Sequence, residues 1–263
     1  MTHSRRFEER VCLVTGSTGI AAAAARALAA EGGLLFVASR SPEHAEALAK
    51  ETGGAWAQAD LSGEEAVDSI VRACVERFGR IDCVYNVAGI SARRFGDGPL
   101  HEMSIDGWRA VIDANLTSMF LVCRAAVRQM LGQPPVEDRR RGVILNMGSV
   151  IARSPSVEFF STHGYAATKG AIESFSRSLA AYYAPHGIRV NVVAPGLVAT
   201  PMSERAQGDP RVLEFVTTKQ PLAGGPMQPD DLVGTALYLL SDDSRMVTGQ
   251  VIDVDAGWGL TEG

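Results

Sequence analysis

The chain has 263 residues, of which 46% are hydrophobic and 21% are charged. This ordinary balance excludes a disordered chain, a coiled coil and a collagen-like repeat. The net charge of −5 argues against a surface that binds duplex nucleic acid. No apolar run reaches the roughly 18–20 residues of a membrane span, and the polar stretch Met1–Arg10 lacks the apolar part of a signal peptide. We therefore expect a cytoplasmic protein with neither a nucleic-acid nor a membrane partner.

The four cysteines also fit that compartment. Cys12, Cys74, Cys83 and Cys123 form no C-x-x-C pair and lie in apolar segments. Buried, reduced thiols are the expected state, and a disulfide or a metal ligand is the alternative. The sequence predicts no metal site.

Short apolar runs alternate with helix-like stretches along the chain. The predicted strands are residues 11–15, 34–39, 55–59, 83–87, 143–147, 188–193 and 250–254. The predicted helices are residues 20–31, 42–51, 64–77, 112–131, 164–185 and 229–241, the second with Ser41 as N-cap. Apolar strands that each precede a helix are typical of a parallel sheet covered on both faces. We expect an α/β fold, a single doubly wound (Rossmann-type) domain over residues 1–263 with about seven parallel strands.

Two segments interrupt this alternation. Residues 132–142 contain two prolines and three consecutive arginines, and we expect an exposed connection there, with a binding patch as the alternative. Residues 197–228 are rich in proline and glycine and have helical character only near 211–217. Long irregular segments in compact domains often cover a site, so this segment is predicted to be a lid.

A glycine turn follows the first predicted strand. Residues 15–21 read Thr-Gly-Ser-Thr-Gly-Ile-Ala and lead into the first predicted helix. Such a turn lets backbone amides approach a pyrophosphate, and the helix N-terminus favours its negative charge. This context predicts nucleotide binding, with a purely structural turn as the alternative. The residues expected to hold the nucleotide here are Gly16, Ser17, Thr18, Gly19 and Ile20.

The end of the second strand indicates which nucleotide binds. NAD sites usually carry an acid at this position, which binds the ribose diol. Here the strand ends in Ser39 and Arg40, and the first acid, Glu43, follows a proline. A hydroxyl and a guanidinium are suited to a 2′-phosphate, so NADP(H) is favoured over NAD(H). The alternative for Arg40 is a solvated loop residue.

Tyr165 and Lys169 are four residues apart and therefore share one face of a helix. An ammonium beside a phenol lowers the phenol pKa from about 10, which makes tyrosine useful as an acid or base. The pattern alone also describes an ordinary surface pair. Its position after a strand that ends in Asn146-Met-Gly-Ser149 favours a catalytic role.

Taken together, these features resemble the short-chain dehydrogenase/reductase family over about residues 8–260. The matching segments, in the family's order, are residues 15–21, Asp60 with Leu61, residues 86–89, Asn115, Ser149, Tyr165 with Lys169, Pro195 and Gly196 with Thr200, and residues 248–257.

The resemblance implies four catalytic residues. Tyr165 would exchange a proton with the carbonyl or alcohol oxygen, and Ser149 would hydrogen-bond that oxygen. Lys169 would bind the nicotinamide ribose and lower the pKa of Tyr165. Asn115 would distort its helix and hold a water molecule in a proton relay to Lys169. For His163 we expect a loop contact, and the alternative is a role as a further acid or base.

The resemblance also implies further cofactor contacts. Asp60 would contact the adenine, although a strand-end cap is the alternative for this residue. The remaining implied contacts are Leu61, Asn86, Ala88, Gly89, Tyr165, Lys169, Pro195, Gly196, Val198 and Thr200.

Two spacings differ from the family pattern. The glycine turn is one residue short, with two residues between Gly16 and Gly19, and Ala21 replaces the last glycine. We expect this to weaken cofactor binding or to change how a 2′-phosphate is held. Fifteen residues separate Ser149 from Tyr165, where the family usually has about twelve, so loop 151–163 is predicted to bulge beside the substrate.

The predicted substrate is a mid-sized ketone or secondary alcohol with an apolar body. The weaker alternative is a substrate on an acyl carrier, which a basic surface of this protein would bind. The walls of the substrate site are assigned to loops 91–103 and 151–163 and to the lid, with both apolar and charged side chains: Phe95, Leu100, Phe159, Phe160, Leu197, Met202, Met227, Arg93, Arg94, Glu158 and Arg205. A homotetramer or homodimer is expected through helix 164–185 and tail 246–260. The competing function is a noncatalytic NAD(P)-binding module, a redox sensor or a partner-stabilising protein.

Overall fold

Seven parallel strands form the centre of the computed structural model, which describes residues 5–136, 139–156 and 158–261. Residues 137–138 of the predicted connection and residue 157 of the predicted bulge lie outside the described residues. The strands are β1 (Val11–Thr15), β2 (Leu34–Ser39), β3 (Ala55–Gln58), β4 (Cys83–Asn86), β5 (Gly142–Met147), β6 (Ile188–Pro195) and β7 (Val251–Val254). Their order in the sheet is β3-β2-β1-β4-β5-β6-β7, which confirms the doubly wound fold.

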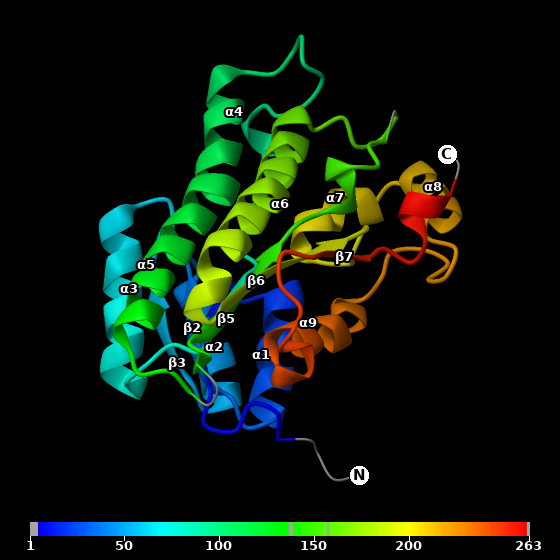
Figure 1. The fold of residues 1–263 in the computed structure, drawn as a ribbon. Coiled ribbons are helices and arrows are strands. Elements are labelled where there is room, and N and C mark those ends of the chain that lie inside the picture. The colour runs from blue at the N-terminus through cyan, green and yellow to red at the C-terminus, as the bar shows by residue number, and fades with distance from the viewer. Residues whose placement is uncertain (1–4, 137–138, 157, 262–263) are drawn as a thin grey trace.

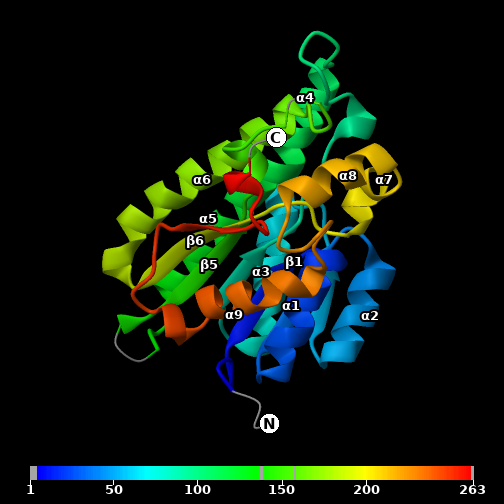
Figure 2. The same ribbon diagram turned by 90° about the vertical axis from the view of Figure 1, so that its right-hand side faces the viewer.

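The helices cover both faces of this sheet. They are α1 (Gly19–Ala30), α2 (Pro42–Thr52), α3 (Glu64–Phe78), α4 (Ile105–Val111), α5 (Ser118–Gly132), α6 (His163–Tyr183), α7 (Glu204–Gln207), α8 (Pro210–Lys219) and α9 (Val233–Leu240). One core contains buried side chains of α3, α5 and α6, and the other contains those of α1, α2 and α9. Figure 1 shows α3, α5 and α6 on one side of the strands, and the turned view in Figure 2 brings α1, α2 and α9 to the front.

The strand register places the chemically interesting strand ends at one edge of the sheet. Thr15 lies beside Asn86, and Asn86 lies beside Asn146. The hydroxyl of Thr15 accepts hydrogen bonds from the amides of Val87 and Ala88, at 3.0 and 3.2 Å. The strand order reverses between β1 and β4, and a ligand in such a sheet binds at that reversal.

The helix predicted at 112–131 begins earlier than expected. Ser104 caps α4, since its hydroxyl accepts a hydrogen bond from the Gly107 amide at 2.9 Å. A π-helical turn, Ile112–Thr117, then joins α4 to α5. The whole helix, 105–132, is long and apolar enough to cross a membrane, but more than half of its most apolar part is buried inside the fold. Such burial is typical of a core helix.

The predicted lid, residues 197–228, contains α7 and α8. Its two ends meet, because Val198 and Met227 form a parallel bridge. The amide of Ala199 donates to the carbonyl of Met227 at 2.8 Å, and the amide of Met227 donates to the carbonyl of Leu197 at 3.0 Å. The segment is therefore a closed loop fastened at its base.

All four cysteines are buried, as the sequence predicts, and the structure shows them as free thiols. In the part of the chain that the structure describes, no cluster of three or more His, Cys, Asp or Glu side chains could hold a metal ion.

Candidate functional site

Two adjoining cavities lie at the carboxyl ends of the strands. Their volumes are about 340 and 220 Å³, and both are lined by the glycine turn and by Ala88, Gly89 and Pro201. The first cavity also brings together the predicted residues Ser39, Arg40, Asp60 and Leu61. The second brings together the predicted residues Gly19, Ile20, Ser149, Tyr165, Lys169, Pro195, Gly196, Val198 and Thr200. Of the predicted site residues, only Asn86 and Asn115 line neither cavity, and both are buried behind them.

The glycine turn forms the wall shared by the two cavities. Gly19 has φ +54°, and a Cβ added there would lie 2.9 Å from the methyl group of Thr200. Thr18 is the N-cap of α1, and its side chain makes no capping hydrogen bond. The first amides of α1 therefore keep their capacity to bind an anion.

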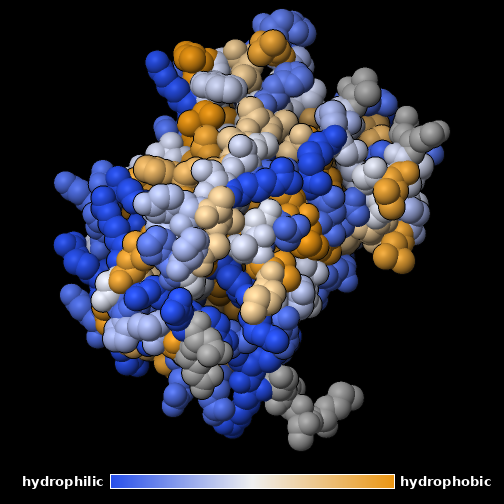
Figure 3. Space-filling model, viewed as in Figure 1, coloured by the Kyte–Doolittle hydropathy of each residue, from blue (hydrophilic) through white to orange (hydrophobic). Residues whose placement is uncertain are grey.

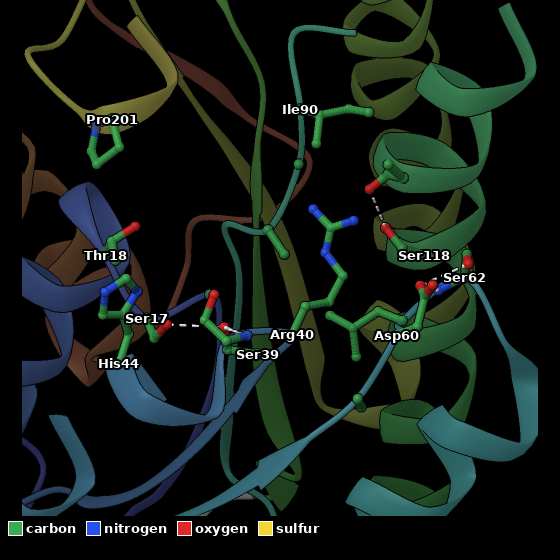
Figure 4. Close-up of a pocket in the computed structure, with 17 residues that line it drawn as sticks. Ser17, Thr18, Ser39, Arg40, His44, Asp60, Ser62, Ile90, Ser118 and Pro201 are labelled. Carbon is green, nitrogen blue, oxygen red and sulfur yellow. Dashed lines mark hydrogen bonds between the residues drawn. The ribbon is translucent and has the colours of Figure 1, made fainter. Parts of the chain in front are cut away.

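Figure 4 shows the first cavity beyond the ends of β2 and β3, between the glycine turn with Ser17 and Thr18 and the helix that carries Ser118. The hydroxyls of Ser17 and Ser39 are hydrogen-bonded at 2.9 Å. The guanidinium of Arg40 extends across the cavity toward Ile90 and Ser118. His44 of α2 also lines the cavity, and its imidazole points toward the turn at Thr18. Sequence reasoning missed His44, because a lone histidine in a polar helix follows no recognisable pattern.

Asp60 has local partners in the structure. One of its carboxylate oxygens accepts from both the amide and the hydroxyl of Ser62, at 3.0 and 2.7 Å. These hydrogen bonds, and then the charge of Arg40, lower the pKa of Asp60. The carboxylate thus caps the turn after β3 and also lines the cavity.

Asn115 lies in the π-helical turn and is buried. Its amide group pairs with the backbone of Ile90, accepting from the amide at 2.7 Å and donating to the carbonyl at 3.0 Å. It also donates to the hydroxyl of Thr168, at 3.3 Å. A Cβ added to Gly89 would lie 2.8 Å from the oxygen of Asn115, so this close approach requires glycine. Asn115 therefore joins the segment after β4 to the helix that carries Tyr165 and Lys169.

Tyr165, Lys169 and Ser149 meet in the second cavity. The ammonium of Lys169 lies 5.4 Å from the ring centre of Tyr165 and donates to the carbonyl of Met147 at 2.8 Å. Burial lowers the pKa of Lys169 to about 8. Burial raises the pKa of Tyr165 to about 12, and its hydrogen bond with Ser149 acts in the opposite direction.

The lowering of the Tyr165 pKa by Lys169, expected from the sequence, is thus not found in the protein alone. Desolvation of the phenol dominates, and the ammonium is engaged with the carbonyl of Met147.

The start of α6 depends on a residue that sequence reasoning did not select. The buried carboxylate of Asp97 accepts from the amides of Gly164 and Tyr165, at 3.0 and 2.8 Å. Thr162, the N-cap residue by position, makes no capping hydrogen bond. Asp97 supplies the missing cap from another segment of the chain. His163 is the first residue of α6 and is exposed.

An aromatic cluster lies beside the second cavity. Phe215 of α8 is 5.2 Å from Phe159, 6.4 Å from Phe160 and 5.7 Å from Trp258 between ring centres. Tyr165 packs against the same apolar cluster. Of the other predicted substrate contacts, Phe95, Leu100 and Met202 are exposed, and Met227 is buried. The cluster holds the predicted bulge against the predicted lid.

Comparison with known proteins identifies relatives over nearly the whole chain. The sequence model of a family described as enoyl-(acyl carrier protein) reductase matches residues 14–259. The chain is 37% identical over 262 residues to 3beta-hydroxysteroid dehydrogenase 1 of Eggerthella lenta, covering 97% of this chain and 95% of that protein. It is 34% identical over 261 residues to a 3-oxoacyl-(acyl-carrier-protein) reductase of Thermotoga maritima, covering 96% and 98%.

Solved structures agree with these sequence matches. A short-chain type dehydrogenase/reductase from Mycobacterium ulcerans superimposes with a TM-score of 0.87 at 27% identity, covering 98% of this chain and 92% of that one. The protein gox2181 gives a TM-score of 0.88 at 30% identity, covering 97% of both chains.

Proposed function

Because the chain belongs to the short-chain dehydrogenase/reductase family, a family of oxidoreductases, we propose that it is an NADP(H)-dependent enzyme that interconverts a carbonyl compound, such as a ketone, and a secondary alcohol. The observation that carries the proposal is the meeting of Ser149, Tyr165 and Lys169 in a cavity that also contains the glycine turn. A hydroxyl, a phenol and an ammonium thus lie in the same cavity as a glycine turn of the kind that binds nucleotides.

The residues present fit a dinucleotide. The glycine turn lines both cavities, and Gly19 brings its backbone close to the methyl group of Thr200, where a Cβ would not fit. The uncapped start of α1 suits a pyrophosphate, and Arg40 adds positive charge at the end of β2. We assign the nicotinamide end to the second cavity, with Lys169 donating to ribose hydroxyls and Pro195, Gly196, Val198 and Thr200 around it. When bound, the nicotinamide supplies the hydride in reduction or accepts it in oxidation.

The side chains of this chain handle the proton. Because its pKa is raised to about 12, Tyr165 holds its proton at neutral pH and donates it to the carbonyl oxygen during reduction. Ser149 hydrogen-bonds the same oxygen and stabilises its developing negative charge. Asn115 keeps the segment after β4 and α6 in register, which sets the relative position of Tyr165 and Lys169.

The preference for NADP(H) rests on the end of β2. Ser39 and Arg40 line the cavity, whereas Glu43 does not. A carboxylate at this point would repel a 2′-phosphate, and a guanidinium attracts it.

The aromatic cluster supports an apolar substrate. Phe159, Phe160 and Phe215 are partly buried in one cluster with Tyr165, and an apolar body can pack against their exposed parts. We propose that the whole chain is one dinucleotide-binding and catalytic domain, with residues 197–228 as a lid over this substrate.

We propose further that the enzyme is cytoplasmic and assembles as a homotetramer or homodimer. The helices α4 to α6 leave large apolar side chains exposed, among them Trp108, Phe120 and Tyr182, at 38, 39 and 69%. Figure 3 shows apolar side chains gathered on the upper part of this face. Such a patch is typical of an interface, and light scattering at micromolar concentration that finds a monomer would contradict assembly.

The test combines binding with turnover. Calorimetric titration with NADPH and NADH should give at least tenfold tighter binding of NADPH. A panel of ketones, followed by loss of reduced-nicotinamide absorbance, should identify a substrate. Tyr165→Phe should keep the fold and nucleotide binding but abolish turnover, because only the phenol proton is lost.

Each contrary result points to a different error. Tighter binding of NADH would show the cofactor assignment to be wrong. Failure of both nucleotides to bind below about millimolar concentration would favour the noncatalytic hypothesis. Full turnover by Tyr165→Phe would contradict the catalytic assignment.

A further inference from the structure

We propose that His44 is a second 2′-phosphate ligand, so that NADP(H) affinity, and with it discrimination against NAD(H), is greater when the imidazole is protonated. This inference rests on the proposed function, and it adds a residue that the family resemblance does not supply.

The geometry places His44 where such a ligand is needed. It lies in the first turn of α2 and lines the same cavity as Ser17, Thr18, Ser39 and Arg40. In Figure 4 the imidazole points toward the glycine turn, while Arg40 extends to the other side of the cavity, toward Ile90 and Ser118. A phosphate beside Ser39 would therefore have a cation on each side.

The short glycine turn supplies no cation for a 2′-phosphate, so a cation from another element is needed. With only Ser17 and Thr18 between its glycines, the turn presents no charged side chain to the cavity. The hydroxyls of Ser17 and Ser39 are bonded to each other, at 2.9 Å. His44 thus adds, from the neighbouring helix, a donor that becomes a cation in mild acid.

Charged groups surround His44, and on its own helix Glu43 directly precedes it in the first turn of α2. Arg40 after β2 stays positive, and hydrogen bonds from Ser62 keep the pKa of Asp60 low, so this carboxylate stays negative. On α1, which packs against α2, Arg26 pairs with Glu51 in the last turn of α2 at 2.8 Å. A protonated imidazole is a cation and a neutral one is not, so we expect the contact between His44 and a phosphate to be stronger in mild acid.

The test compares four proteins at about pH 6 and pH 8.5: the full-length wild type, His44→Gln, His44→Arg and the surface control His186→Gln. Calorimetry gives the dissociation constants of NADP⁺ and NAD⁺, so no turnover is needed. A phosphate monoester itself titrates near about pH 6, but it does so equally in every variant, and ratios to wild type remove this contribution.

The expected result is specific in nucleotide and pH. His44→Gln should weaken NADP⁺ binding about fivefold at pH 6, should leave it nearly unchanged at pH 8.5, and should not affect NAD⁺. His44→Arg should restore the affinity at pH 6 and exceed wild type at pH 8.5, because its charge is permanent. His186→Gln should match wild type.

Two outcomes would overturn the inference about His44. One is unchanged NADP⁺ binding by His44→Gln at pH 6, and the other is an equal loss for NADP⁺ and NAD⁺. Failure of the NADP(H) assignment itself would look different, since wild type would then show no preference for NADP⁺ even at pH 8.5, where only Arg40 acts.

Discussion

The carboxylate of Asp97 accepts a hydrogen bond from the backbone amide of Tyr165, at 2.8 Å. It also accepts from the amide of Gly164, so one buried acid in the loop after β4 fixes the first turn of the helix that carries the proposed proton donor. The negative charge at a helix N-terminus is also favourable.

Asp97→Ala should therefore lower both stability and turnover. Loss of a buried, charged cap is expected to cost about 2 kcal/mol. Turnover number should fall more than nucleotide affinity, because Tyr165 moves while the first cavity does not. Denaturant unfolding and steady-state kinetics measure the two effects. Asp97→Asn, which keeps one acceptor, should be intermediate, and Asp106→Asn in the exposed first turn of α4 should behave as wild type.

Gly89→Ala should disturb the hydrogen bonds of Asn115, although Asn115 itself is not substituted. The added Cβ would lie 2.8 Å from the Asn115 oxygen, so the bond to the Ile90 amide must lengthen or break. A loss of about 1–3 kcal/mol is expected from a buried hydrogen bond left unmade. Thermal unfolding checks this, with Gly170→Ala as the control. At that helix position a Cβ meets nothing within 4 Å, and the variant should be slightly more stable than wild type.

The ammonium of Lys169 should make stability rise with pH at mildly alkaline values. Its pKa is lowered by burial from 10.5 to about 8, so between these values the unfolded chain binds more protons at this site than the folded one. Lys169→Met should lose this contribution. The unfolding free energies of wild type and variant are measured by denaturant at about pH 7.5 and pH 9.5. The wild-type value minus the variant value should be larger at the higher pH. A constant difference would contradict the assignment of buried charge.

Phe215→Ala should loosen the lid. The ring joins α8 to both Phe159 and Trp258, and its removal leaves a partly buried gap that costs about 2 kcal/mol. We expect faster proteolysis within 197–228 and a higher KM, with cofactor affinity unchanged. Thr218→Ala, on the exposed face of the same helix, should show none of these changes.

The sequence predicted the sheet well because its central strands are buried on both faces. All seven strands lie within two residues of the predicted bounds at each end, since runs such as Val11–Thr15 and Gly142–Met147 have little alternative to a central strand. The start of the long helix was missed for the opposite reason. Ile105, Trp108 and Val111 recur at helical spacing, but Ile105 and Trp108 are exposed, at 61 and 38%, and so lie outside the core face of the helix.

The sequence predicted those parts of the site whose residues lie close together along the chain. Tyr165 and Lys169 lie on one helix, so spacing alone brings them together. The pair Asp97–Tyr165 and the contact of Asn115 with Ile90 join segments far apart in the sequence, and no local pattern announces them. The pKa of Tyr165 depends on burial by the lid and by the loop after β5, which is likewise a tertiary property.

The strand order has a consequence for how the chain folds. Strand β1 pairs with β2 on one side and with β4 on the other, placing Cys12 beside Cys83. In the chain, β2 and β3 with their helices come between β1 and β4. The pairing of β1 with β4 at the centre of the sheet therefore closes a long loop. During synthesis, the edge of β1 that later receives β4 is exposed until Cys83–Asn86 has emerged. We therefore expect the pairing of β1 with β4, which brings the proposed nucleotide site together, to be a slow and aggregation-sensitive step in forming the molecule.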